Sequence, residues 1–238
     1  MSVSMNTSLI EGINRVAVID DEVAQAELTS YKLEEAGFDP IIIEASNPFA
    51  THEELTIAVR ETQAQGLVCD HRLTRHRFSQ FNGASYVASL YGALPAILTT
   101  QYIEIDVDVS IREFRERIPV LLSRDDTVPK ILVQAFRIVI DELSGKISSQ
   151  RKAYRAVVRI TELSSVGQEK VVEAFIPQWN PRRAVRFPFK LIPEEIRDLV
   201  NPGVRLLSSV NIEAKNSDDL YFRDFELAPD PDPEDGLG

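Results

Sequence analysis

Short apolar runs alternate with longer amphipathic stretches over the first 145 residues. The runs are five or six residues long and rich in β-branched side chains, and they cover residues 15–19, 40–45, 66–70, 95–100 and 118–123. Continuous runs of this kind suit parallel strands that are covered on both faces. The amphipathic stretches lie between them, at residues 22–36, 52–65, 84–92 and 128–145. This alternation predicts an α/β domain with a doubly wound, five-stranded parallel sheet.

Two of the intervening stretches have a clear helical periodicity. Residues 22–36 are predicted to form a helix from the spacing of five residues, namely Ala24, Leu28, Tyr31, Leu33 and Ala36, with Gly37 as its stop. In residues 52–65 the spacing places Leu55, Ala58 and Val59 on the inward face. Residues 101–117 alternate like a strand before the pattern becomes helical, so a short or displaced helix is expected there.

The pattern of hydrophobic and polar residues changes after Lys146. Five β-like segments follow, at residues 153–163, 170–176, 184–189, 203–214 and 219–227, with one helical insert at 192–200. They predict a smaller β-rich domain, either a five-stranded antiparallel sheet or a small barrel. The expected organisation is an N-terminal arm (1–13), an α/β domain (14–147), a β-rich domain (150–228) and an acidic tail (229–238).

Composition narrows the class of protein further. The chain carries 26 Lys and Arg against 37 Asp and Glu, a net charge of −11, which argues against a strongly basic nucleic-acid binder. The single cysteine, Cys69, excludes an internal disulfide and a cysteine-based metal cage. No apolar run is long enough for a membrane span, and no signal-type start is present, so a cytoplasmic location is expected.

Acidic and hydroxyl side chains follow the predicted parallel strands. Asp20 and Asp21 come after the first strand, Asp70 ends the third and Thr100 ends the fourth. Functional groups of an open parallel sheet gather at the carboxyl ends of its strands. Three carboxylates at one edge call for a hard divalent cation such as Mg²⁺, and one of them could then attack a phosphoryl group.

The motifs VAVIDDE, GLVCDHRL and PAILTT resemble the first, third and fourth strand motifs of response-regulator receiver domains, over roughly residues 14–145. The resemblance implies a flavodoxin-like fold and a magnesium site formed by Asp20, Asp21, Asp70 and the backbone carbonyl of Arg72. It further implies that Asp70 accepts the phosphoryl group and that Thr100 senses it. Asn82-Gly83 resembles the turn that opens the third helix of this family.

Several positions depart from the family pattern. The lysine expected after the fifth strand is absent, and either Ser123 or Arg124 takes its place as the phosphate-sensing group. Val120 stands where an aromatic switch residue is expected. The connection after Asp70 is long and basic, with the cluster His71, Arg72, Arg75, His76 and Arg77, which we interpret as a solvated loop or a partner contact.

These observations predict a two-component signalling protein. A histidine kinase or phosphotransfer protein would phosphorylate Asp70, and the β-rich domain would pass the state to another protein. No enzymatic activity is expected beyond phosphate uptake from a donor and self-dephosphorylation. Two alternatives remain open. One is a phosphorylation-independent pseudo-receiver that acts as a protein-binding scaffold, with the helix at 128–145 as its candidate dimer contact. The other is a nucleic-acid-binding regulator that uses Arg182, Arg183 and Arg186.

Overall fold

The computed structural model describes residues 12–101 and 107–229, and the predicted arm and acidic tail lie almost wholly outside this part. The chain divides into two compact units. The first comprises residues 1–103 and 117–147, and the second comprises residues 104–116 and 148–238. The contiguous range 14–147 is therefore interrupted by a segment, 104–116, that belongs to the second unit.

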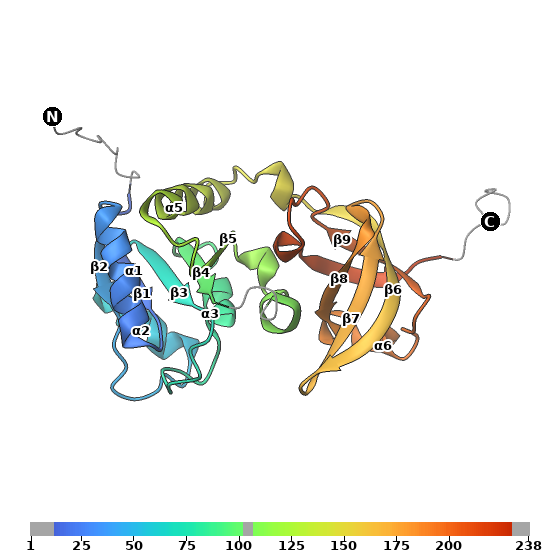
Figure 1. The fold of residues 1–238 in the computed structure, drawn as a ribbon, viewed down its shortest axis with the longest axis horizontal. Helices are drawn as coiled ribbons and strands as arrows, with labels where there is room; N and C mark the ends of the chain where they lie inside the picture. Colours follow the sequence, from blue (N-terminus) through green and yellow to red (C-terminus); the bar gives the residue numbers. More distant parts are fainter. Residues whose placement is uncertain (1–11, 102–106, 230–238) are drawn as a thin grey trace. The chain divides into compact units, whose positions relative to one another are not determined.

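The first unit is a five-stranded parallel sheet with the order β2-β1-β3-β4-β5 (Figure 1). Its strands are β1 (Arg15–Ile19), β2 (Asp39–Ile42), β3 (Gly66–Asp70), β4 (Ala96–Thr100) and β5 (Val120–Ser123). Its helices are α1 (Val23–Glu35), α2 (His52–Glu61), α3 (Gly83–Ser89) and α5 (Pro129–Leu143). The expected flavodoxin-like, doubly wound sheet is confirmed, with each element within a few residues of its predicted bounds.

Local chemistry explains where these helices begin and end. The Thr51 hydroxyl accepts the Glu54 N–H at 3.2 Å, while the Glu54 carboxylate accepts the Ala50 N–H at 2.8 Å, so the start of α2 is capped from both sides. Pro129 lies in the first turn of α5, where its missing N–H has no cost. Gly37 follows α1 with a φ of +88°, a conformation that favours glycine.

Helices α1 and α5 pack on one face of the sheet around Leu33, Phe38 and Phe136. The inward face predicted for α2 is confirmed for Leu55 and Val59, which are buried, while Ala58 is half-buried. In α1 the buried residues are Ala26 and Leu33, seven residues apart, so the stripe that contains Leu28 and Tyr31 is exposed. The periodicity identified the helix but did not identify its buried side.

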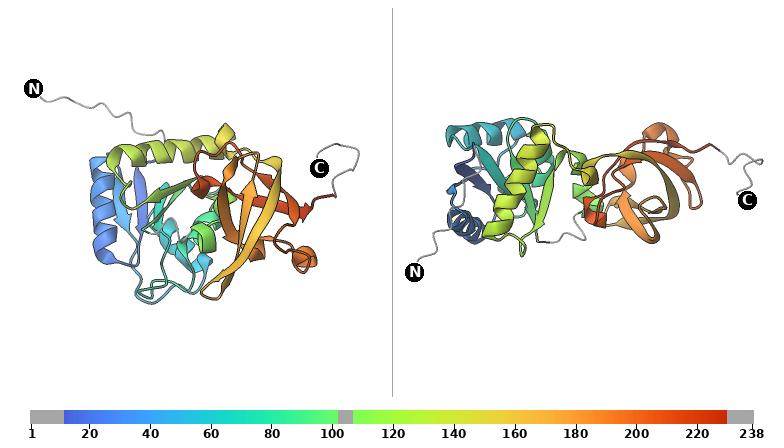
Figure 2. Two further views of the ribbon diagram at one scale, coloured as in Figure 1. Left: turned by 45° about the vertical axis from the view of Figure 1, so that its right-hand side comes forward. Right: turned by 90° about the horizontal axis from the view of Figure 1, so that it is seen from above.

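The second unit is an antiparallel sheet with the order β10-β9-β6-β7-β8. Its strands are β6 (Tyr154–Val166), β7 (Glu169–Ile176), β8 (Asn180–Pro188), β9 (Arg205–Val210) and β10 (Phe222–Leu227). The helical insert is only one turn, α6 (Glu194–Arg197), and the turn between β7 and β8 lies at residues 177–179. Strand β6 pairs with β9 through its first half and with β7 through its second, and the sheet curves strongly (Figure 2).

The described part of the β4–β5 connection contains a π-helical turn (Val107–Ile111) and a 3-10 turn (Arg115–Arg117). The prediction of a short or displaced fourth helix is thus confirmed, and the displacement has a cause. The guanidinium groups of Arg112 and Arg115 are buried and hydrogen-bonded to the loop at residues 217–220 of the second unit.

Among the described residues, no helix is long and apolar enough to cross a membrane.

Candidate functional site

Three aspartates meet at the carboxyl-end edge of the parallel sheet. Asp20 follows β1, Asp21 comes next, and Asp70 is the last residue of β3. One carboxylate oxygen from each lies within 4.8 Å of the other two. The Asp70 side chain is only 2% exposed and that of Asp20 6%. The sequence prediction that these three carboxylates converge is therefore reproduced in the geometry.

Arg124 lies directly against two of these carboxylates. Its Nη2 is 2.9 Å from Asp70 Oδ1 and 3.2 Å from Asp20 Oδ2, and its Nε donates to Asp70 Oδ1 at 3.1 Å. The sequence left open whether Ser123 or Arg124 replaces the missing lysine. Arg124 is the residue whose side chain reaches Asp70, whereas the Ser123 hydroxyl accepts the Asp125 N–H at 3.3 Å. Arg124 also donates its own N–H to the Thr100 carbonyl at 3.0 Å, which ties the ends of β4 and β5 together.

Burial and mutual repulsion make the two inner carboxylates reluctant to ionise. Burial, followed by repulsion from Asp70, raises the pKa of Asp20 to about 7. Burial also raises the pKa of Asp70, although Arg124 and the hydrogen bond from the Arg72 N–H act in the opposite direction. Attraction to Asp70 and Asp20 outweighs burial at Arg124 and raises the pKa of its guanidinium. A bound cation would stabilise the ionised form of these carboxylates.

Asp70 is fixed by the chain that follows it. Its Oδ2 accepts the Arg72 N–H at 2.7 Å, and the Gly83 N–H donates to the His71 carbonyl at 2.8 Å. A Cβ at Gly83 would lie 1.9 Å from the Asp70 carbonyl oxygen, so only glycine fits there. Asn82-Gly83 does open α3, as the family resemblance implied, and its role is this close approach to the β3 end.

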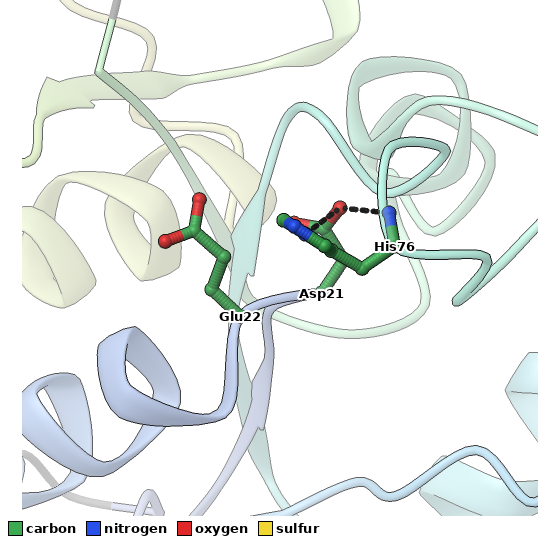
Figure 3. A group of neighbouring side chains, drawn as sticks. All are labelled: Asp21, Glu22 and His76. Carbon is green, nitrogen blue, oxygen red and sulfur yellow. Dashed lines mark hydrogen bonds and ion pairs between the residues drawn. The ribbon is translucent and has the colours of Figure 1, made fainter.

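His76 is an unforeseen neighbour of the acidic cluster. Its backbone N–H donates to Asp21 Oδ2 at 2.9 Å, and its ring Nδ1 lies 3.1 Å from the same oxygen. A second group of side chains with potential metal-ligand atoms close together consists of Asp21, Glu22 and His76. Figure 3 shows this group, with dashed lines for the two contacts between His76 and Asp21. The predicted solvated loop is thus corrected in part, because His71 is buried and His76 folds back onto the site. The cluster of arginine and histidine residues after Asp70 does not indicate, from sequence alone, that His76 contacts Asp21.

The mouth of the site carries charged side chains of both signs. Its lining comprises Asp21, Glu22, Asp70, Arg72, Arg75, Gln101 and Arg124. A wider cleft of about 470 Å³ opens beside Asp20 and Asp21, between α1, the end of β2 and residues 76–78. Arginine side chains around a buried carboxylate can neutralise an incoming phosphoryl group.

The remaining predicted site residues divide into two groups. Thr100 is fully buried at the end of β4, next to Ser123 in the register of β4 and β5. Arg182, Arg183 and Arg186 lie on β8 in the other unit, so they are not part of the acidic site. Arg182 and Arg183 are exposed, and Arg186 is half-buried.

The donor set fits Mg²⁺. All three converging ligands are carboxylate oxygens, which is the chemistry this ion prefers, and the cluster carries more negative charge than Arg124 can offset. Arg124 would have to yield part of its contact with Asp20 and Asp70 when the cation enters. The Arg72 carbonyl as a fourth ligand stays a prediction.

Comparisons with solved structures concern the N-terminal part of the chain. A sensor protein from Polaromonas sp. JS666 is 15% identical, with 55% of this chain and 98% of that chain covered and a TM-score of 0.42. A receiver domain protein from Clostridium thermocellum is 18% identical, with 56% and 98% covered and a TM-score of 0.41. The receiver domain of NarL from Mycobacterium tuberculosis is 18% identical, with 56% and 98% covered and a TM-score of 0.38. No family model matches the chain, and the search of curated proteins found no match.

The fold of the N-terminal unit follows from its strand order. A five-stranded parallel sheet in the order 2-1-3-4-5 is the flavodoxin-like, doubly wound architecture, and here acidic residues stand after β1 and at the end of β3. The N-terminal unit has this fold, and a separate β-rich unit follows it in the chain.

Proposed function

We propose that the N-terminal unit accepts a phosphoryl group on Asp70 with the help of Mg²⁺ and passes this state to the β-rich unit. The observation that carries the proposal is the convergence of Asp20, Asp21 and Asp70 with Arg124 at the end of β3. Asp20, Asp21, Asp70 and the Arg72 carbonyl would hold the ion, which would neutralise charge on the phosphoryl oxygens.

The transfer itself uses the chain's own residues. An Asp70 carboxylate oxygen attacks the phosphorus of a phosphohistidine on the partner kinase or phosphotransfer protein. The P–N bond breaks, its electron pair returns to the imidazole nitrogen, and that nitrogen takes up a proton. Arg124, already in contact with Asp70, would move with the new phosphoryl oxygens, and the Thr100 hydroxyl would donate a hydrogen bond to one of them.

The β4–β5 connection supports the relay to the second unit. It begins just after Thr100, and its described residues 107–116 belong to the β-rich unit. Arg151 strengthens that attachment, because its guanidinium donates to the carbonyls of Arg115 and Glu116. A movement at Thr100 would therefore act on a segment that is built into the output unit, and no detachable surface helix is needed.

The test is phosphorylation of the purified protein by acetyl phosphate, followed by intact mass. A Mg²⁺-dependent gain of one phosphoryl group is expected in the wild type and in the exposed control Asp125→Asn, and its loss is expected in Asp70→Asn. No gain in the wild type would overturn the proposal.

One observation favours a second candidate, a phosphorylation-independent scaffold. Arg124 bridges Asp70 and Asp20, so part of the site's negative charge is neutralised by the protein itself. For a scaffold, neither Mg²⁺ nor acetyl phosphate would change the chain, and partner binding would be the same in Asp70→Asn.

A further inference from the structure

A row of outward-facing residues crosses three neighbouring strands of the antiparallel sheet, β9, β6 and β7 (Figure 1). Arg205 of β9 is directly opposite Arg159 of β6, and Arg159 is directly opposite Phe175 of β7. The neighbours of Arg159 in β6, Val158 and Ile160, are buried in the core, so the row faces away from the core. Both arginines are exposed, and Phe175 is half-buried.

A bulge in the next strand, β8, adds two more arginines. The register of β7 and β8 shifts directly after Phe175, so residues 181–183 are displaced from the ladder. The Arg182 N–H donates to the side-chain oxygen of Asn180 at 2.9 Å, and both Arg182 and Arg183 are exposed. The strand order places Phe175 between the two pairs of arginines. We call these four residues the arginine row: Arg159, Arg182, Arg183 and Arg205.

The arginine row lacks the acidic partners that other arginines of the sheet have. Arg155 forms an ion pair with Glu226, and Arg186 is directly opposite Glu173 in the ladder. In the part of the chain that the structure describes, no acidic group lies within ion-pair distance of the arginine row. Like charges directly opposite one another on adjacent strands are destabilising. An anionic ligand would therefore stabilise this face of the sheet.

The ligand chemistry follows from what lies beside these charges. Phe175 presents an aromatic side chain, and the adjoining outward row pairs Val157 of β6 with Leu207 of β9, both half-buried. Guanidinium groups bind phosphates, while aromatic rings and guanidinium planes stack on nucleic-acid bases. The bases of a duplex are stacked on one another, so only a single strand can place a base on Phe175.

We propose that the outer face of the β-rich unit binds single-stranded nucleic acid, with phosphates on the arginine row and a base on Phe175. The net charge of −11 belongs to the whole chain, and charges more than about 10 Å away are largely screened at 0.1 M salt. This function goes beyond phosphoryl transfer and does not depend on Asp70.

The test is fluorescence anisotropy of labelled oligo(dT) and oligo(U), each of about 16 nucleotides, titrated with the full chain. At low ionic strength we expect both to bind, and the two arms distinguish DNA from RNA. The logarithm of the association constant should fall with the logarithm of salt concentration with a slope of about −3, at roughly 0.7 for each of four phosphate contacts.

Two variants separate charge from stacking. Arg159→Gln/Arg205→Gln should weaken binding about five- to tenfold and reduce the salt slope by about 1.4. Phe175→Leu should weaken binding at least about fivefold without changing the slope, since it removes a stacking surface and no charge. Phe175→Tyr keeps an aromatic ring and should bind like the wild type.

The matched control is Lys152→Gln/Lys215→Gln, which removes the same charge from exposed positions of the unit outside the row. It should bind like the wild type. Absence of binding in the wild type, equal affinities of the arginine and lysine variants, or wild-type affinity in Phe175→Leu would overturn the proposal. A last arm adds oligoglutamate of equal charge. If it displaces the oligonucleotide at equal concentration, the row serves an acidic protein and the proposal is wrong.

Discussion

Arg124 contacts two of the carboxylates that would hold Mg²⁺, so we expect it to compete with the ion. Its guanidinium contacts Asp70 at 2.9 Å and Asp20 at 3.2 Å. Replacing it by glutamine, in Arg124→Gln, removes one positive charge and leaves both carboxylates in place. We expect this change to tighten Mg²⁺ binding, since the ion no longer has to displace a guanidinium and is no longer repelled by it.

The magnitude follows from the contacts that are lost. A hydrogen bond between charged groups contributes about 1.5–3 kcal/mol net, and the Arg124 side chain is 17% exposed, so the lower half of this range applies. The Coulomb repulsion between Mg²⁺ and a guanidinium fixed in its present position would be larger than this value. The long Arg124 side chain can move partly away from the ion, which reduces the repulsion. About 1.4 kcal/mol corresponds to a factor of ten. The dissociation constant for Mg²⁺ should therefore fall roughly ten- to thirtyfold.

The assay is calorimetric titration of Mg²⁺ into the metal-free wild type, Arg124→Gln and the control Arg137→Gln. Arg137 is exposed on α5, so its replacement removes the same charge from the unit without touching the site. The control corrects for the general effect of net charge. An unchanged or weaker affinity in Arg124→Gln would refute the competition, and equal tightening in both variants would reduce it to long-range electrostatics.

Four further outcomes are expected. Because the pKa of Asp20 is about 7, the metal-free protein holds a proton on this carboxylate at lower pH, and Mg²⁺ must displace that proton to bind. The affinity for Mg²⁺ should therefore fall by up to about tenfold per pH unit below 7 and level off above it. Titration of Mg²⁺ in buffers of different pH measures this dependence. Without metal the sign for stability is opposite: a raised pKa stabilises the fold below pH 4, and this contribution is lost as pH rises through 7, which thermal unfolding of wild type against Asp20→Asn would show. Gly83→Ala should cost about 1–3 kcal/mol in the free energy of unfolding, because its Cβ meets the Asp70 carbonyl, and a variant as stable as wild type would contradict the close approach. Arg115→Met should destabilise the β-rich unit by about 1.5–3 kcal/mol, since the half-buried Asp219 loses a charged hydrogen-bond donor, whereas the exposed Arg117→Met should leave hydrogen exchange in β9 and β10 unchanged.

The acidic half of the site could be predicted because each aspartate is fixed by a strand end. Once β1 and β3 are recognised, the direction of a parallel strand places Asp20 and Asp70 at one edge. The cationic half depends on which way side chains turn beyond the strands. Ser123 and Arg124 are neighbours in the chain, and only the contact of Arg124 with Asp70 in the folded structure distinguishes them.

The contact of His76 with Asp21 had no sequence signal at all. The two residues are 55 positions apart, and the contact depends on how the long connection after β3 folds back. The same limit applies to α1, where the hydrophobic spacing could be satisfied by two faces. Long-range packing chose the face of Ala26 and Leu33, which propensity and periodicity do not encode.

Two buried arginines hold the described part of the β4–β5 connection in the β-rich unit. A buried guanidinium is tolerated only where its donors are satisfied, and Arg112 donates to the carbonyls of Ser217 and Leu220 at 2.8 Å each. Burial, followed by repulsion from Arg151, lowers the pKa of Arg115 to about 10, and Asp219 counters this at 2.7 Å. Withdrawing the segment from the β-rich unit would leave the 217–220 carbonyls and Asp219 without these donors. Residues 107–116 are therefore held in the β-rich unit by buried hydrogen bonds, an attachment that a surface helix would lack.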